Sequence, residues 1–130
     1  MKLEVGMYVR TKYGIAKIIK TDFINEYLDK PFLVVDRELE IGLIGGNDES
    51  LCDKKDIIGK PSYEVTDLIE VGDIIAIKEN IDKYAQVFIL GIYEPQLLNE
   101  IKSKIDRNEL ILDSVLTKEQ FESMKYEVYE

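Results

Sequence analysis

Residues 68–75 read LIEVGDII, and residues 2–9 read KLEVGMYV, so that the same pattern recurs at an offset of 66 residues. Both copies contain Glu-Val-Gly followed by apolar residues, which is typical of a turn that opens a strand, because glycine can adopt a positive φ. The offset is about half of the 130-residue chain. The repeat therefore predicts two similar units laid end to end.

The first unit, residues 1–61, reads as a succession of short strands. Apolar and polar residues alternate over 7–12, and a tight Tyr13-Gly14 turn leads into a returning strand over 15–21, which predicts a hairpin. Further strands are expected over 32–37, 38–44 and 57–58, with a polar loop over 47–56.

The second unit, residues 62–130, combines strands with helix. Pro95 suits the first turn of a helix over about 95–105, whose apolar stripe is Leu97, Leu98, Ile101 and Ile105. The spacing of Thr117 and Gln120 predicts a capping box and a short helix over 118–124. Strands are expected over 73–78, 84–93, 109–116 and 125–129.

The strand that contains residues 87–92 is apolar on both faces. Such a strand is typical of a central or interfacial position, so we expect it to be covered by the helix or by a second subunit in a homodimer. The abundance of isoleucine, 18 residues against 3 alanines, also favours strands. The predicted fold is mostly β: two small SH3-like barrel units in tandem, with one amphipathic helix inserted in the second.

The composition excludes many classes of active site. The chain has no histidine and a single cysteine, Cys52, so a Ser-His-Asp triad, a histidine or all-cysteine zinc site and an intrachain disulfide are all impossible. We predict no catalytic residues, no metal and no cofactor. An acid near the start replaces the apolar run of a signal peptide, and no apolar stretch could span a membrane, so we expect a cytoplasmic protein.

The charge is strongly negative and unevenly distributed. Lys and Arg number 17 and Asp and Glu 26, for a formal charge of −9, which disfavours general binding to nucleic acid or to an anionic membrane. The first 20 residues nevertheless sum to +4, and the remaining 110 to −13. Any contact with nucleic acid should therefore be local to the first hairpin.

Three segments resemble small phage and prophage proteins of clostridia and related Gram-positive bacteria. They are MKLEVGMYVRTKYGIAK (1–17), DLIEVGD (67–73) and TKEQFESMKY (117–126), and the likeness covers about a third of the chain. Residues 79–112 depart from it. The resemblance implies a phage-borne accessory gene in a host cytosol and no particular activity, and a function specific to this chain could lie in the divergent part.

Two groups of residues are candidate contact surfaces. Basic and aromatic side chains of the first hairpin could meet phosphates and stack on bases, or could form a solvated face whose lysines prevent aggregation. Acidic side chains near the end could imitate a line of phosphates and occupy a basic cleft, or could serve only solubility. The first group is Tyr8, Arg10, Lys12, Lys17 and Lys20, and the second is Glu119, Glu122, Glu127 and Glu130.

These observations favour a non-enzymatic, phage-type accessory protein that binds and inhibits a host macromolecule. A defence protein or nuclease with a basic cleft is the expected kind of partner. One alternative is a protein that sequesters a nucleotide signal, with Arg10, Lys12, Lys17 or Arg107 on the phosphate. Another is a nucleic-acid-binding module that uses the basic hairpin.

Overall fold

The computed structural model describes residues 2–37, 49–82 and 84–127, without the side chains of 123–127. The chain divides into two compact units, Met1–Leu68 (unit 1) and Ile69–Glu130 (unit 2). Each contains one antiparallel sheet, which confirms a mostly-β fold. Within the described ranges, no helix is both long and apolar enough to cross a membrane.

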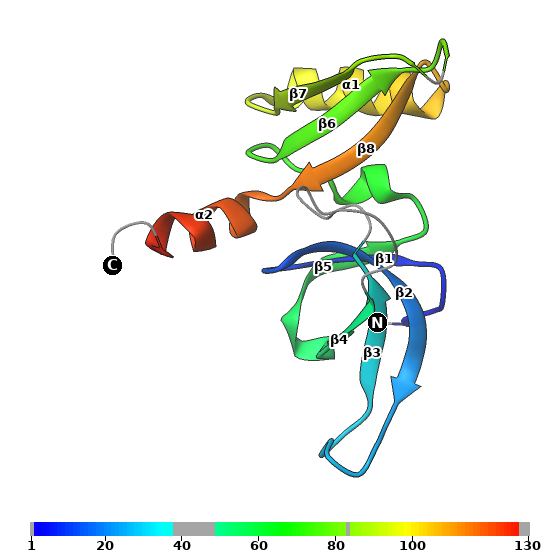
Figure 1. The fold of residues 1–130 in the computed structure, drawn as a ribbon, viewed down its shortest axis with the longest axis vertical. Coiled ribbons are helices and arrows are strands. Elements are labelled where there is room, and N and C mark those ends of the chain that lie inside the picture. The colour runs from blue at the N-terminus through cyan, green and yellow to red at the C-terminus, as the bar shows by residue number, and fades with distance from the viewer. Residues whose placement is uncertain (1, 38–48, 83, 128–130) are drawn as a thin grey trace. The chain divides into compact units, whose positions relative to one another are not determined.

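Unit 1 is a five-stranded antiparallel sheet with the strand order β4-β3-β2-β1-β5 (Figure 1). The last strand returns to pair with the first, and a 3-10 turn precedes it. Among the described residues no pairing joins β4 to β5, so hydrogen bonds do not close this sheet into a barrel. The elements are β1 (Tyr8–Thr11), β2 (Gly14–Phe23), β3 (Phe32–Asp36), β4 (Glu49–Cys52), η1 (Lys54–Asp56), β5 (Ile57–Ser62) and η2 (Val65–Leu68).

The core of unit 1 lies on one face of this sheet. Val9, Ile18, Leu33, Val35 and Cys52 form a buried cluster, against which neighbouring apolar side chains pack. β1 departs from the expected alternation, because η2 packs on it and its residues are buried on both faces; consecutive residues are also buried in β3 and at the start of β2.

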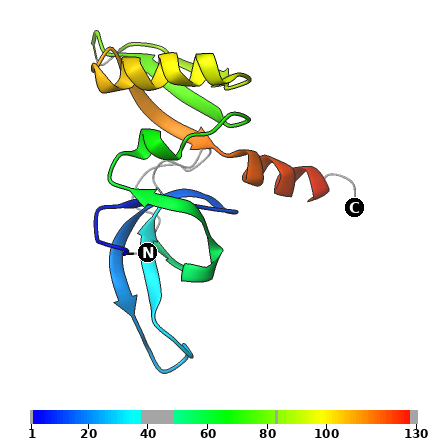
Figure 2. The ribbon, with the colours of Figure 1, turned by 180° about the vertical axis from the view of Figure 1, so that it is seen from behind.

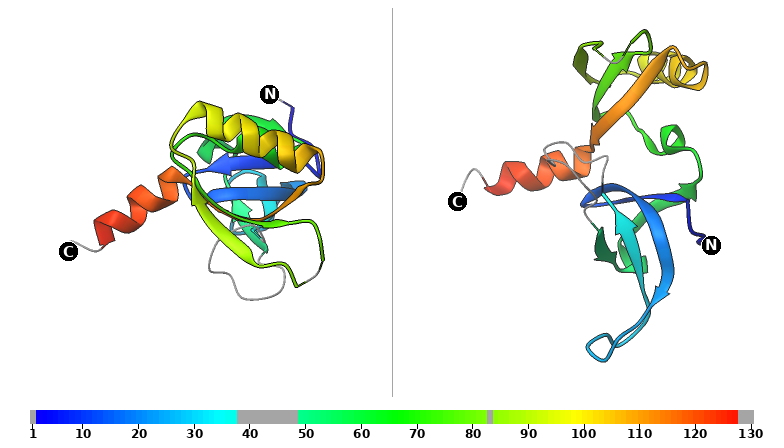
Figure 3. Two further views of the ribbon diagram at one scale, coloured as in Figure 1. Left: turned by 90° about the horizontal axis from the view of Figure 1, so that it is seen from above. Right: turned by 45° about the vertical axis from the view of Figure 1, so that its right-hand side comes forward.

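Unit 2 is a three-stranded antiparallel sheet with the order β7-β6-β8. The helix α1 packs against β8 and lies across one face of the sheet (Figure 2, Figure 3). Its predicted position is confirmed: Pro95 stands in the first turn, and Ile101 of the apolar stripe is buried. The elements are β6 (Ile74–Glu79), β7 (Val87–Gly91), α1 (Pro95–Asp106), β8 (Leu110–Leu116) and α2 (Lys118–Glu127).

Several predicted elements differ from the structure. The strand over 87–92 is not central: β7 is an edge strand, and Val87, Phe88 and Ile89 are 44%, 55% and 72% exposed. The final strand over 125–129 is wrong, because α2 continues to Glu127. β4 occupies part of the predicted polar loop 47–56, whereas the strand expected over 38–44 lies outside the described residues.

The first Glu-Val-Gly turn places Gly6 at a φ of +95°, as the sequence predicts. The Met7 N–H donates to the Glu4 carbonyl at 3.2 Å and closes the turn. Two further backbone bonds tie the turn to β2: Gly6 N–H donates to the Ile18 carbonyl at 2.9 Å, and Ile18 N–H donates to the Met7 carbonyl at 2.8 Å.

The second Glu-Val-Gly turn repeats this geometry bond for bond. Gly72 has a φ of +103°, and Asp73 N–H donates to the Glu70 carbonyl at 3.1 Å. Gly72 N–H donates to the Ile92 carbonyl at 2.7 Å, and Ile92 N–H donates to the Asp73 carbonyl at 2.8 Å. The repeat in the sequence is therefore a repeat in backbone structure, although the sheets that follow differ in size.

Candidate functional site

Only part of the contact surface predicted on the basic hairpin of unit 1 is exposed in the structure. Lys12, Lys17 and Lys20 are exposed, whereas Tyr8 is half-buried. Tyr8 stands opposite Lys17 in the β1–β2 register, and the Lys17 ammonium lies 5.9 Å from the centre of the Tyr8 ring. The predicted aromatic residue is thus already engaged by one of the predicted lysines.

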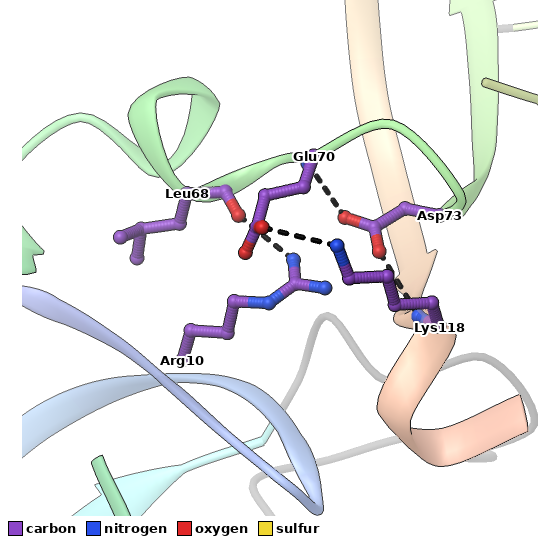
Figure 4. A network of polar contacts seen from close by, with 5 residues as sticks. All are labelled: Arg10, Leu68, Glu70, Asp73 and Lys118. Atoms are coloured by element: carbon purple, nitrogen blue, oxygen red, sulfur yellow. Dashed lines mark hydrogen bonds and ion pairs between the residues drawn. The ribbon is translucent and has the colours of Figure 1, made fainter. Parts of the chain in front are cut away.

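Arg10 does not share an exposed face with these residues. Its side chain is 1% exposed, and its Nη1 donates to the Leu68 carbonyl at 2.8 Å (Figure 4). The alternation in the sequence predicts that Arg10 points away from Val9, but it cannot reveal that η2 covers this second face of β1. Arg10 is therefore separated from the exposed residues of the predicted contact surface, and it anchors η2 to the sheet.

An exposed cluster of two cations and one ring stands at the tip of the hairpin. The Lys12 ammonium lies 5.0 Å and the Arg37 guanidinium 5.6 Å from the centre of the Tyr13 ring. Interaction with the Tyr13 side chain raises the pKa of Lys12. Arg37 was not predicted from the sequence, because it reaches the hairpin only through the register of β2 with β3, in which its neighbour Asp36 pairs with Lys17.

Cys52 is not a nucleophile of this surface. The side chain is buried in the core cluster, and burial, followed by nearby carboxylates, raises the pKa of the thiol. A thiol with a raised pKa holds little thiolate at neutral pH.

The neighbouring Asp53 accepts the Lys55 N–H at 3.1 Å and forms an ion pair with Lys30 at 3.2 Å. The bond from Lys55 is the main reason why the pKa of Asp53 is lowered.

A buried carboxylate fixes the start of α2 to the second Glu-Val-Gly turn. Asp73 is fully buried and accepts two backbone N–H groups, from Glu70 at 2.8 Å and from Lys118 at 3.0 Å (Figure 4). The Lys118 ammonium reaches back to the Glu70 carboxylate at 3.2 Å. The turn and the first residue of α2 therefore form one polar network inside unit 2.

The predicted capping box completes this attachment. The Thr117 N–H donates to Gln120 Oε1 at 2.9 Å, and the Gln120 N–H donates to Thr117 Oγ1 at 3.3 Å. Both side chains are buried. These bonds satisfy donors at the helix start that would otherwise lack partners, and α2 runs from Lys118 to Glu127.

The structure brings together two of the four predicted acidic residues. Glu119 is half-buried and Glu122 exposed, and their spacing of three residues places them on one side of α2. Glu127 is the last residue of α2, and Glu130 lies outside the described residues. The acidic surface is therefore defined by Glu119, in the first turn of α2 at its anchored end, and Glu122, about one turn further along.

A shallow hollow of about 570 Å³ opens beside the second Glu-Val-Gly turn, lined by residues 71–74 and 90–93. Gly91 forms part of it, and no heavy atom lies within 4 Å of the place where a Cβ would stand on this residue. Tyr93, on the rim, is exposed. This hollow was not predicted from the sequence, where its one signal is a glycine inside an otherwise apolar strand.

Comparisons of the chain with protein-family models, with curated proteins and with solved structures found no match. In the part of the chain that the structure describes, no group of three or more Cys, Asp and Glu residues stands where it could hold a metal ion. The candidate surfaces are therefore set by geometry alone: the Tyr13 cation cluster, the acidic side of α2, and the hollow beside β7.

Proposed function

We propose that this chain is a non-enzymatic accessory protein of phage type that binds and inhibits a basic host macromolecule in the cytoplasm. A defence protein or a nuclease is the expected kind of partner. The observation that carries the proposal is the attachment of α2, which presents Glu119 and Glu122 from an anchored helix. The charge supports it, since residues 69–130 hold 13 acidic and 7 basic residues, a net of −6.

The attachment matters because a surface held in place loses less conformational entropy on binding than a flexible tail does. Asp73, Thr117 and Gln120 hold the first turn of α2 through three hydrogen bonds, including both arms of the capping box, and a fourth bond from the Glu70 N–H fixes the Asp73 carboxylate to its own turn. Two carboxylates one turn apart on such a helix resemble neighbouring phosphates in charge. A basic cleft that binds nucleic acid would attract them over a distance, in a salt-dependent manner.

The test is to remove the two charges while keeping the helix. Glu119→Gln with Glu122→Gln should weaken binding to the captured host protein at least tenfold and abolish protection of phage on an expressing host. The matched control is Glu26→Gln with Glu64→Gln, which removes two exposed charges from unit 1. Equal binding by both double variants, or the absence of any specific host partner, would reject the proposal.

A second candidate function rests on the Tyr13 cluster. Two cations beside one half-exposed ring could hold a phosphate while the ring stacks on a base, as in a nucleic-acid-binding module or a nucleotide-sequestering protein. Arg107, the other residue considered for a nucleotide, pairs with Glu109 at 2.9 Å. A mobility shift at physiological salt supports nucleic acid, a thermal shift with a nucleotide supports sequestration, and Tyr13→Ala should remove either.

We also infer that unit 1 has SH3-like topology. A meander of four strands, a single 3-10 turn after β4, and a fifth strand that returns to β1 support this inference. On this inference, unit 2 is a smaller version of the same topology: it contains the opening turn and the first pair of strands, together with the additional helix α1. An experimentally determined structure of unit 1 tests this, because an SH3-like barrel requires β4 and β5 to approach each other across the core.

A further inference from the structure

The free edge of β7 lacks the usual protection of an exposed strand. Within the described sheet, β7 pairs with β6 alone. Val87, Phe88 and Ile89 are exposed, and residues 85–92 contain neither a charged residue nor a proline. Natural edge strands usually carry lysine, proline or a bulge that prevents pairing with another chain. An unprotected edge is therefore a ready template for an added strand.

The hollow lies at the end of this edge and supplies a place for a side chain. Gly91 is the last residue of β7 and stands opposite Ile74, and the space above its Cα is open. Glycine within a strand often marks a point where another backbone or ligand approaches closely. The edge and the hollow together offer main-chain pairing along β7 and one apolar recess at its end.

Charge determines which occupant suits this edge. Exposed Glu79 ends the neighbouring strand β6, exposed Glu94 follows β7 along the chain, and unit 2 carries a net of −6. A second copy brings the same negative field, whereas a basic segment is attracted by it. In two copies paired about Ile89, Val87 would stand opposite Gly91 and Ala85 opposite Tyr93, so it is the charge that favours a basic segment over a second copy.

We propose that the free edge of β7 is a strand-addition site for an extended, basic segment of a partner polypeptide, which places an apolar side chain in the hollow over Gly91. This proposal rests on the proposed function, from which it takes the basic charge of the partner. It adds a defined place on unit 2 where that partner docks. Main-chain hydrogen bonds supply affinity in this mode of recognition, and the recess supplies specificity.

The probe is a blocked seven-residue peptide of alternating lysine and apolar residues, added to the isotope-labelled full chain. We expect the backbone amide signals of residues 87–91 to shift, and the alternate amides among them that face away from β6 to gain protection from hydrogen exchange. The same peptide N-methylated at its three central residues keeps its charges but cannot pair, so it should bind at least tenfold more weakly. A peptide with glutamate in place of lysine should also bind at least tenfold more weakly.

Two variants separate docking from folding. Gly91→Val fills the recess; the site has room for a Cβ, and a β-branched residue suits a strand, so the variant should unfold no more easily than the parent. We expect it to bind the peptide at least tenfold more weakly. Ile89→Lys should do the same by placing a charge on the edge, and its matched control is Ile81→Lys, where the residue is 73% exposed outside β7.

Three results would overturn the proposal. Unchanged binding by Gly91→Val and Ile89→Lys, or equal binding of the N-methylated peptide, would show that charge alone attracts the probe. A dimer in sedimentation that Ile89→Lys dissociates would show that a second copy occupies the edge. Loss of the host partner with the Glu119 and Glu122 double variant, but not with Gly91→Val, would reject this docking point and leave the proposed function standing.

Discussion

The two Glu-Val-Gly turns share a backbone and differ in what lies over the glycine. In unit 1 the ring of Tyr63 lies 3.6 Å from the position of a Cβ on Gly6, and the Tyr63 hydroxyl donates to the Glu4 carboxylate. In unit 2 the Lys118 side chain lies 3.1 Å from the corresponding position on Gly72, and its ammonium binds Glu70. In both units the glutamate accepts a hydrogen bond from the side chain that covers its glycine.

The residue after each glycine explains how the units diverge. Met7 is half-buried and packs against the core of its sheet, whereas Asp73 is fully buried and binds two backbone N–H groups. A buried carboxylate is tolerated only where such donors satisfy it. The same local turn thus joins a sheet to its own core in unit 1, and a sheet to a helix in unit 2.

The largest difference between the turns should appear on truncation of Asp73. Asp73→Ala leaves two backbone N–H groups without their acceptor and should lower the free energy of unfolding by about 3 kcal/mol. Met7→Ala should cost about 1 kcal/mol, since only part of an apolar contact is lost. Urea denaturation measures both, with the exposed Asp29→Ala as control. A loss below about 1 kcal/mol for Asp73→Ala would contradict the anchoring role.

Unit 1 keeps its buried polar anchor on the strand rather than on the turn. Arg10→Met retains much of the side-chain volume but removes the donor to Leu68, so the free energy of unfolding should fall by about 2 kcal/mol. Lys12→Met, two residues along on the exposed hairpin, should change it by less than about 0.5 kcal/mol. If chemical denaturation showed equal effects for the two variants, the burial of Arg10 would have no energetic importance.

Local signals in the sequence were enough to predict the shared parts of the two units. Both glycine turns, the first hairpin, α1 and the Thr117–Gln120 capping box are each encoded within about a dozen residues, and all are present. The burial of Arg10 depends on η2, 58 residues further along, which no alternation of polar and apolar residues can show.

The order of the strands in the sheet of unit 2 could not be predicted from the sequence either. An apolar run such as 87–92 suits a central strand, and only the pairing of both β7 and β8 with β6 shows that it stands at an edge. The same limit applies to the candidate surfaces: Lys12 was predicted, but Arg37 joins it through strand register, and the hollow over Gly91 requires two distant segments.

Substitution of Gly6 and Gly72 directly compares the side chains that lie over the two turns, Tyr63 and Lys118. Alanine at either position meets a positive φ, a cost of about 1 kcal/mol. Gly72→Ala must also displace Lys118, so we expect about 2 kcal/mol there and about 1 kcal/mol for Gly6→Ala. Gly59→Ala isolates the backbone cost, since its φ is +72° and nothing lies within 4 Å. Equal losses at Gly6 and Gly72 in thermal or urea unfolding would show that Lys118 yields without cost.

The smallest effect should appear in the titration of Glu4 and Tyr63, the bonded pair at the first Glu-Val-Gly turn in unit 1. The hydrogen bond from Tyr63, followed by Lys2, lowers the pKa of Glu4, and the same bond raises the pKa of Tyr63. The lowered carboxyl pKa stabilises the fold above the ordinary glutamate pKa, and this contribution is lost as the pH falls through the folded value. The raised tyrosine pKa stabilises the fold below the ordinary tyrosine pKa, and this contribution is lost as the pH rises through the folded value.

Tyr63→Phe should therefore move the Glu4 pKa upward, towards its ordinary value, when the carboxyl is followed by NMR. The remaining Lys2 ion pair at 3.3 Å should keep part of the shift. The control is Tyr27→Phe, because Tyr27 is exposed and belongs to the β2–β3 connection rather than to the Glu-Val-Gly turn. An unchanged Glu4 pKa in Tyr63→Phe would mean that Tyr63 covers Gly6 by packing alone, and that only the Lys118 cover in unit 2 is held by its glutamate.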